Sequence, residues 1–357
     1  MTETDLDSAW DDFLQEEEED EISTYVPQYL SFQPGEKTGV VPKCSEIYIS
    51  TKTKIAYLNQ KIDLNELFWK IDILLYHEPR EGIIKKQMKF ICHTKEELRA
   101  LKEKLVNVSY LDEFILTSID NPDSGRIKFK DVRKISIGVN KKDILSYRCK
   151  KKSAFYNCFV LIMRVFYNEE FHEIHVKVFN TGKLEIPGIK DNGILTKVLD
   201  SLVDTFRPLL KDQVSWTKDI YTVLINSNFN CGFYINRARL FEVIQFKYNI
   251  SSVYDPCSYP GIQCKFYYDT RISGDKQTGS APDEMSKHIK KVSFMIFRTG
   301  SVLIVGKCDE VELNQIYQFL KEMLSAEYEY IVEHVVDPVN KKIERPKKLR
   351  RKTIMIK

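Results

Sequence analysis

The chain contains one short segment twice, at a constant spacing. Residues 177–190 read KVFNTGKLEIPGIK, and residues 295–308, which lie 118 positions later, read MIFRTGSVLIVGKC. From Val176 to Lys190 the identical positions are Phe179/Phe297, Thr181/Thr299, Gly182/Gly300, Ile186/Ile304 and Gly188/Gly306. A second set recurs at an offset of 173: Ile62/Ile235, Leu67/Leu240 and Phe68/Phe241. Self-similarity at two offsets indicates an internal duplication, with extra sequence in the first copy.

The residue patterns predict the same order of elements in both copies: a strand, a helix, several antiparallel strands and a long helix. In the first copy these are a strand or hairpin at 46–59, a helix at 63–76, strands at 158–167, 171–179 and 183–189, and a helix at 191–209. In the second they are a strand pair at 221–234, a helix at 235–248, a strand at 258–269, a hairpin at 291–306 and a helix at 309–327. The extra sequence, 78–152, predicts a strand (Ile83–Ile91), a helix (Lys95–Val106) and a hairpin ending near Arg148.

Two β-rich halves of this kind tend to join edge to edge, because each leaves an open sheet edge. Two helices per half can cover only one face of the joined sheet. The predicted fold class is therefore α+β, with an antiparallel sheet of two repeats, helices on one face and an insert in the first repeat. Phe179 and Phe297 then either belong to the core or project from the uncovered face.

Charge is divided unevenly along the 357 residues, whose net charge is +3. Residues 1–22 hold eleven acids and no base, whereas Lys341–Lys357 hold nine bases and one acid. A split of this kind indicates a polyanionic partner for the basic parts. The predicted organisation is an acidic disordered tail (1–40), a first repeat (41–210) with its insert (78–152), a second repeat (211–333) and a basic tail (334–357).

No pattern points to catalysis or to a cofactor. The eight cysteines are scattered without a C-x-x-C pair, so we expect reduced thiols and no metal. His172 and His175 are three residues apart, which puts them on opposite sides of a strand. No apolar run reaches the length that crosses a membrane.

Both copies resemble the TATA-box-binding protein family. In copy two, SSVYDPCSYPGIQCKFYY followed by VSFMIFRTGSVLIVGK is similar to the second repeat of that family. In copy one, FVLIMRV and VKVFNTGKLEIPGIK are similar to the first. The resemblance covers about 45–77 and 155–330, and GIIKKQMKF and INSNFNCGFYINR are most similar to versions from large DNA viruses. It implies a saddle-shaped sheet that grips the minor groove of DNA.

The resemblance also implies roles for individual residues. Wedge rings for base steps fall on Phe179, Phe297 and Tyr259. The fourth position falls on Cys158 in an ungapped alignment, and the neighbouring Phe159 is the substitute. The positions that form the floor of the groove-binding face are Glu185 and Pro187 in copy one and Leu303 and Val305 in copy two. Asn226 and Asn228 supply side-chain amides near the centre of that face. Phosphate contacts fall on Arg164, Lys183 and Lys265, and a contact with a B-type initiation factor falls on Asp255. Glu185 would repel the acceptor-lined groove, so copy two is the more DNA-competent half.

The expected function is that of a non-enzymatic transcription initiation factor that binds and bends double-stranded promoter DNA. Its expected partners are a B-type initiation factor or polymerase subunits, and we expect a monomer without membrane contact. The viral likeness implies action in the host cytoplasm (viral factories) or nucleus, with packaging in the virion as a further option. Two alternatives remain: a protein-interaction scaffold of the same fold without DNA binding, and a nucleic-acid repair enzyme.

Overall fold

The computed structural model describes residues 40–121, 127–145, 157–210 and 213–333. The residues described from Val41 to Glu333 belong to one compact unit. The predicted acidic tail, apart from Val40, and the predicted basic tail lie outside the described residues. No helix in the described part of the chain is both long and apolar enough to cross a bilayer.

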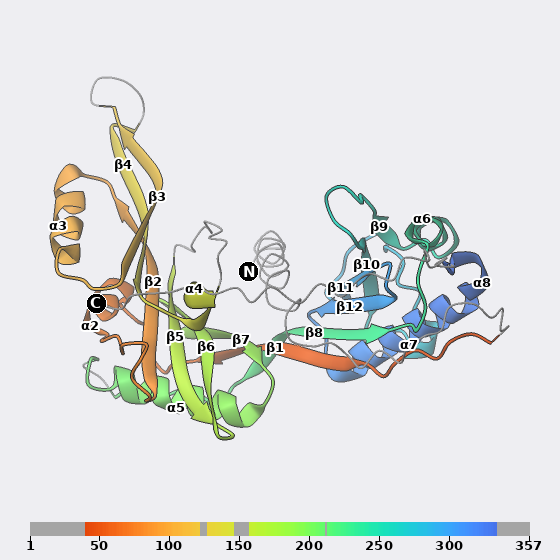
Figure 1. Ribbon diagram of the computed structural model, residues 1–357, viewed down its shortest axis with the longest axis horizontal. Coiled ribbons are helices and arrows are strands. Elements are labelled where there is room, and N and C mark those ends of the chain that lie inside the picture. The colour runs from red at the N-terminus through yellow and green to blue at the C-terminus, as the bar shows by residue number, and fades with distance from the viewer. Residues whose placement is uncertain (1–39, 122–126, 146–156, 211–212, 334–357) are drawn as a thin grey trace, which may run out of the picture. The chain divides into compact units, whose positions relative to one another are not determined.

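Twelve antiparallel strands form one sheet in the order β3-β4-β2-β5-β6-β7-β1-β8-β12-β11-β10-β9 (Figure 1). The first copy supplies β1 (Tyr48–Tyr57), β2 (Gly82–Cys92), β5 (Cys158–Tyr167), β6 (Glu170–Phe179) and β7 (Lys183–Ile189). The second supplies β8 (Tyr221–Asn230), β9 (Ser251–Val253), β10 (Ile262–Asp269), β11 (Ile289–Ile296) and β12 (Ser301–Gly306). The ribbon β3 (Leu111–Asp120) and β4 (Phe129–Gly138) comes from the predicted insert.

The strand order confirms the duplication. Read outward from the central pair, the first copy runs β1, β7, β6, β5, β2 and the second runs β8, β12, β11, β10, β9. In the first copy β4 and β3 continue the sheet beyond β2. Because β2 takes the place that β9 has in the second copy, the additional elements follow Cys92, inside the predicted insert. The boundaries of the domains stay predictions.

Helices of both copies pack on the same face of this sheet. They are α2 (Leu64–Lys70), α3 (Lys95–Leu105), α5 (Asn192–Phe206), α6 (Arg237–Glu242), a π-helical turn (Val243–Lys247), α7 (Glu310–Ala326) and the short α8 (Tyr328–Ile331). The five-residue α4 (Lys141–Leu145) is the exception and lies on the other face, beside Lys85. Lys52 in β1 lies opposite both Ile189 and Ile225, which belong to the two hydrophobic cores. The two cores therefore lie under one face, and α5 and α7 run along it (Figure 1). The α+β class with helices on one face is confirmed; the other face is called the open face below.

Most predicted elements are found, and three differ. The strand pair predicted at 221–234 is one strand, β8 (Tyr221–Asn230), because the chain leaves the sheet after Asn230. The helix predicted at 63–76 ends at Lys70, where the Lys86 ammonium donates to the carbonyls of Phe68 and Ile71 (2.7 and 2.6 Å). The helix predicted at 235–248 divides into α6 and the π-helical turn.

The repeated Thr-Gly turns have the same geometry in both copies. Gly182 and Gly300 have φ values of 85° and 80°, and each donates its N–H to the carbonyl of the preceding phenylalanine, Phe179 or Phe297 (3.0 Å in both). A Cβ on Gly182 would lie 2.3 Å from a backbone oxygen of Gln60, and one on Gly300 would lie 2.4 Å from that of Phe233. The turns therefore require glycine for two reasons, a left-handed backbone and a close backbone approach.

We expect Gly300→Ala to lower the free energy of unfolding by more than the about 1–2 kcal/mol that a left-handed backbone costs an L-residue. Gly188→Ala is the matched control, because Gly188 has a φ of 77° but nothing within 4 Å of its added Cβ. Urea denaturation of both variants measures the difference, which isolates the close contact. Equal destabilisation of the two variants would contradict this account.

Candidate nucleic-acid interface

The open face of the second copy is formed by alternate residues of its strands. In β10 every second residue, beginning with Ile262, is buried under the helices, whereas Gln263, Lys265 and Tyr267 are half-buried on the open face. On β8 and β12, Asn226 lies opposite Val305, and Asn228 lies opposite Leu303. This alternation is typical of a sheet with one covered face. The structure thus brings five of the predicted site residues onto one surface: Lys265, Asn226, Asn228, Leu303 and Val305.

Asn226 is the polar group of this face that lacks a partner. Its side chain is 1% exposed, and neither its amide nitrogen nor its amide oxygen has a hydrogen-bond partner among the described residues. Asn228, by contrast, donates to the Ser50 hydroxyl (2.9 Å). A buried amide without partners costs about 1–3 kcal/mol. A ligand that donates to and accepts from Asn226 would recover that free energy.

Tyr259 and Phe297 form a ring pair beside this surface. Their ring centroids are 5.9 Å apart with planes inclined by 57°, and both side chains are half-buried. A Cβ on Gly261 would lie 3.0–3.1 Å from the two rings, so a glycine lets them meet. The Tyr259 hydroxyl donates to the sulfur of Met295 (3.4 Å). Two of the predicted wedge rings are therefore placed together.

The loop that carries Tyr259 is fixed at both ends. The Asp255 carboxylate accepts the Cys257 N–H (3.0 Å) and the Ser258 hydroxyl, and its carbonyl accepts the Tyr259 N–H (2.9 Å). The Ser258 hydroxyl and then the Cys257 N–H lower the pKa of the Asp255 carboxyl. Arg237 donates to the Pro260 carbonyl. Asp255, predicted to bind a partner, is exposed and also orders this loop.

In the first copy the corresponding rings are placed differently. Phe179 is half-buried, and the Lys183 ammonium lies 5.0 Å from the centre of its ring. Phe159 is fully buried under the helices, with its ring centroid 6.3 Å from that of Phe68. The prediction that Phe159 supplies a wedge is therefore wrong. In β5 it shares its face with Leu161 and Val165, which belong to the core, so strand alternation points it away from the open face.

Glu185, which was expected to repel DNA, has an ion-pair partner. Lys177 on the neighbouring strand lies directly opposite, and its ammonium is 2.8 Å from the Glu185 carboxylate. Both side chains are mostly buried. The pair reduces the repulsion without removing the cost of desolvating the two charges. The sequence analysis did not identify Lys177 as the partner of Glu185. The two residues are eight positions apart on either side of the β6–β7 turn, so their pairing could have been predicted.

The outer strands of the first copy are covered on both faces. Nearly every residue of β2 and β5 is buried, unlike the alternating pattern of β10. On the open face, Leu74 and Tyr76, which follow α2, pack against Ile84 and Ile162. The Asp143 carboxylate of α4 lies 2.7 Å from the ammonium of Lys85. The chain's own segments thus occupy a part of the first copy where the second copy is open.

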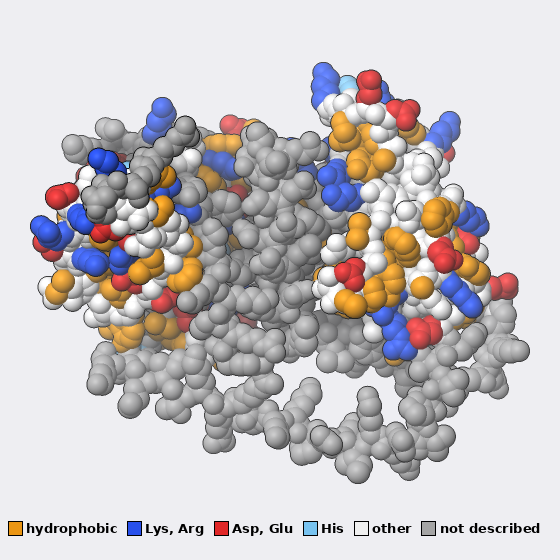
Figure 2. Space-filling model, turned by 90° about the horizontal axis from the view of Figure 1, so that it is seen from above, with side chains coloured by type: hydrophobic (Ala, Val, Ile, Leu, Met, Phe, Trp, Pro, Cys, Tyr) orange, Lys and Arg blue, Asp and Glu red, His pale blue; other side chains and the backbone are white. Residues whose placement is uncertain are grey.

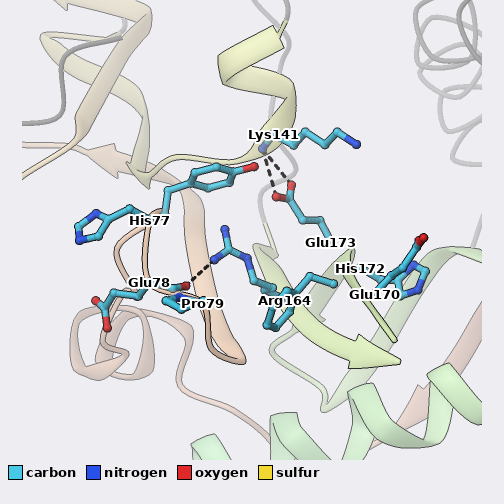
Figure 3. Close-up of a pocket in the computed structure, with 10 residues that line it drawn as sticks. His77, Glu78, Pro79, Lys141, Arg164, Glu170, His172 and Glu173 are labelled. Carbon is cyan, nitrogen blue, oxygen red and sulfur yellow. Dashed lines mark hydrogen bonds between the residues drawn. The ribbon is translucent and has the colours of Figure 1, made fainter. Parts of the chain in front are cut away.

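Arg164 lies within this covered part, at the far end of β5 from Cys158. It is 6% exposed, and it donates to the carbonyl of Glu78 (2.9 Å). It lines a pocket together with Lys141, Glu173 and other residues of the β5–β6 end (Figure 3). Its burial separates it from the other predicted phosphate contacts, Lys183 and Lys265, which are half-buried.

The described surface is mixed in charge. Figure 2 shows lysine and arginine side chains interspersed with acidic and hydrophobic ones. Among the described residues, no group of three or more His, Cys, Asp or Glu side chains is placed to hold a metal ion. Binding of a polyanion by such a surface depends on a few aligned lysine and arginine side chains and on apolar contact.

Comparison with known proteins agrees with the resemblance seen in the sequence. No family model matches the chain. A "TATA-box-binding protein-like" protein of Acanthamoeba polyphaga mimivirus is 27% identical over 207 residues, which cover 53% of each chain. The chain thus spans about half the length of this curated relative. A solved structure entitled "Methanococcus jannaschii TBP" aligns with a TM-score of 0.37 and 11% identity, over 79% of this chain and 99% of that one. The similarity to the mimivirus protein confirms the resemblance to the viral TATA-box-binding-protein-like proteins.

We expect Asp255→Ala to speed amide hydrogen exchange at Cys257, because the substitution removes the acceptor of its N–H. The same loop should loosen in the unsubstituted protein at acidic pH. Because the pKa of Asp255 is lower in the folded protein than in the unfolded chain, the stabilisation is fully present above the unfolded pKa, and it is lost as pH falls through the folded pKa. Asp275→Ala, in another loop, is the control. Unchanged exchange at 257–259 in Asp255→Ala would show that the loop is held by other contacts.

Proposed function

We propose that this protein is a non-enzymatic transcription initiation factor that binds the minor groove of promoter DNA with its open face and bends the duplex. Support comes from the name of its mimivirus relative and from the arrangement of the second copy. The single observation that carries the proposal is the Tyr259–Phe297 ring pair beside the surface formed by β8, β12, β11 and β10. The helices pack on the opposite face, so the rings and that surface face the same ligand.

The physical argument is one of exchange. Inserting a ring between base pairs costs a few kcal/mol of stacking, and the opened groove then lies against apolar sheet that recovers this cost. Leu303 and Val305 would supply apolar floor, the unpartnered amide of Asn226 would contact base edges, and Lys265 and Lys183 would contact phosphates. A tyrosine wedge needs a partner for its hydroxyl at the kink, and water or a phosphate provides one.

The proposed contact is asymmetric. Because β2 and β5 are covered on their open side, the duplex would rest on the second copy and on β1, β7 and β6 of the first. Phe179 and Lys183, at the β6–β7 turn, remain in this reduced contact, whereas Phe159 and Arg164 do not. The footprint should therefore be shorter on the side of the first copy.

The proposed partners are a B-type initiation factor or polymerase subunits, which would bind the complex of this protein with DNA. Asp255 is exposed and hydrogen-bonded within the loop that carries Tyr259. The affinity of a partner that binds Asp255 would therefore depend on the conformation of this loop. The likeness to a viral protein supports action in the host cytoplasm, at viral factories, or in the nucleus, with packaging in the virion as a further proposal.

A second candidate, a protein-interaction scaffold of the same fold, is favoured by the covering of β2 and β5. A sheet face covered by its own chain cannot receive a duplex there. The two candidates predict different behaviour towards DNA.

Selection of bound sequences from a random duplex pool tests the proposed function. We expect an enriched element, and an affinity for it that falls by orders of magnitude as salt rises from about 50 to 200 mM, because several phosphates are neutralised. A scaffold would enrich no sequence and show weak binding at every salt concentration. That result would leave the second candidate as the function.

We expect Tyr259→Ala with Phe297→Ala to abolish DNA bending, measured by energy transfer between dyes at the ends of the duplex. Since both rings are only half-buried, the loss in unfolding free energy should stay below the about 3–5 kcal/mol per buried aromatic ring. Phe246→Ala with Tyr330→Ala is the matched control, because these rings are 78% and 48% exposed. Unchanged bending with a large loss of stability would place the pair in the core and refute the wedge role.

A further inference from the structure

The amide of Asn226 on the open face has both a donor and an acceptor to offer to a ligand. Its side chain is 1% exposed, and neither its nitrogen nor its oxygen has a hydrogen-bond partner among the described residues. Its cross-strand neighbours are Thr51 on β1 and Val305 on β12, and neither bonds to it. An amide donates from one atom and accepts at the other, so its complement is an edge that carries an acceptor and a donor side by side.

Asn228, two residues along on the same face, shows why selectivity should lie at Asn226. The Asn228 amide nitrogen donates to the Ser50 hydroxyl (2.9 Å), and its side chain is half-buried. Asn228 is thus partly satisfied without a ligand. At Asn226 a ligand that matches one amide atom and misses the other leaves a buried group unpaired, which carries the full desolvation penalty of that group.

The minor groove of DNA offers a matching edge at one kind of base pair. A·T and T·A pairs present only acceptors there, adenine N3 and thymine O2, whereas a G·C pair adds a donor, the guanine N2 amino group. Against an A·T pair the Asn226 nitrogen would donate and its oxygen would stay unpaired. Against a G·C pair the nitrogen would donate to guanine N3 and the oxygen would accept from the N2 amino group, so both atoms would be satisfied.

We propose that Asn226 selects a guanine at one position of the bound element, through the N2 amino group in the minor groove. This rests on the proposed function and adds the base that this residue recognises. Leu303 and Val305, which form the apolar floor, cannot accept a hydrogen bond, so an amino group placed against them would be unpaired. The element is therefore rich in A·T pairs with a guanine at Asn226, whereas the word TATA in the name of the mimivirus relative implies A·T pairs alone.

The burial of Asn226 lowers the affinity for DNA without changing this preference. At 1% exposure the amide meets a base only after the groups above it have moved. That movement costs the same for every base pair, so its free energy cancels when two duplexes are compared.

The test uses the full-length protein and four duplexes of one mixed A·T sequence that differ in a single central pair: A·T, G·C, inosine·C and 2-aminoadenine·T. Inosine is the analogue of guanosine without the N2 amino group, and 2-aminoadenine is adenine with one. Fluorescence anisotropy measures each affinity. We expect G·C and 2-aminoadenine·T to bind about 5- to 150-fold more tightly than A·T and inosine·C, because a bidentate contact discriminates between bases by about that factor.

Asn226→Leu should lose the preference for the amino group, whereas Asn314→Leu, at an exposed position of α7, should keep it. Without DNA, Asn226→Leu should not lower the urea midpoint of unfolding, because leucine is similar in size and brings no unpaired amide. A lower midpoint would show that the amide is satisfied in the folded protein, and it would overturn the proposal.

Equal binding of the four duplexes by the unsubstituted protein would overturn this proposal and leave the proposed function intact. A preference for the amino group that survives in Asn226→Leu would also overturn it, because another residue would then recognise the guanine. Binding to none of the duplexes would overturn the proposed function as well, and a protein ligand would then be the match for the amide.

Discussion

The backbone pairing of β1 with β8 is the interaction on which the rest of the structure depends. Each copy ends in a strand whose outer edge would otherwise be unpaired, and the pairing of Lys52 with Ile225 joins the edges into one sheet. Because side chains alternate along a strand, this register also decides which residues share a face. It places Ile189 and Ile225 together under the helices and Asn226 on the opposite side. A slip of one residue at this seam would exchange the two faces of one copy.

The two copies use the same strand order for different surfaces. In the second copy the open face carries half-buried side chains along β10 and the buried Asn226 and Val305 on β8 and β12, with a ring pair beside them. In the first, Leu74 and Tyr76 follow an α2 that stops at Lys70, and they cross onto the open face. The early stop depends on Lys86, whose ammonium satisfies the carbonyls at the helix end. One buried lysine thus helps to place packed protein over β2 and β5 on the open face.

The duplication and the turns could be predicted from the sequence because they depend on local requirements. Gly182 and Gly300 are needed for a positive φ, and the identical spacing of Phe179 and Phe297 follows from the same turn. The position of Phe159 was predicted wrongly because similarity to a family pattern outweighed alternation along the strand. Its neighbours Leu161 and Val165 already marked that face as core. The wedge roles of Phe297 and Tyr259 remain predictions, now with the two rings in contact.

Other features could not be predicted because they depend on residues far apart in the chain. The contact of Tyr76 with Arg164 joins residues 88 positions apart, and no local pattern reports it. Burial of a cation is expensive, and the structure tolerates it only where packing around the cation holds it in place. Arg164 is held in this way by the Glu78 carbonyl, by Tyr76 and by Glu173 opposite it on β6, whereas Asn226 is a buried amide that no described residue satisfies. Arg164 lies in the first copy and Asn226 in the second, so the two copies differ in how fully the described residues satisfy their buried polar groups.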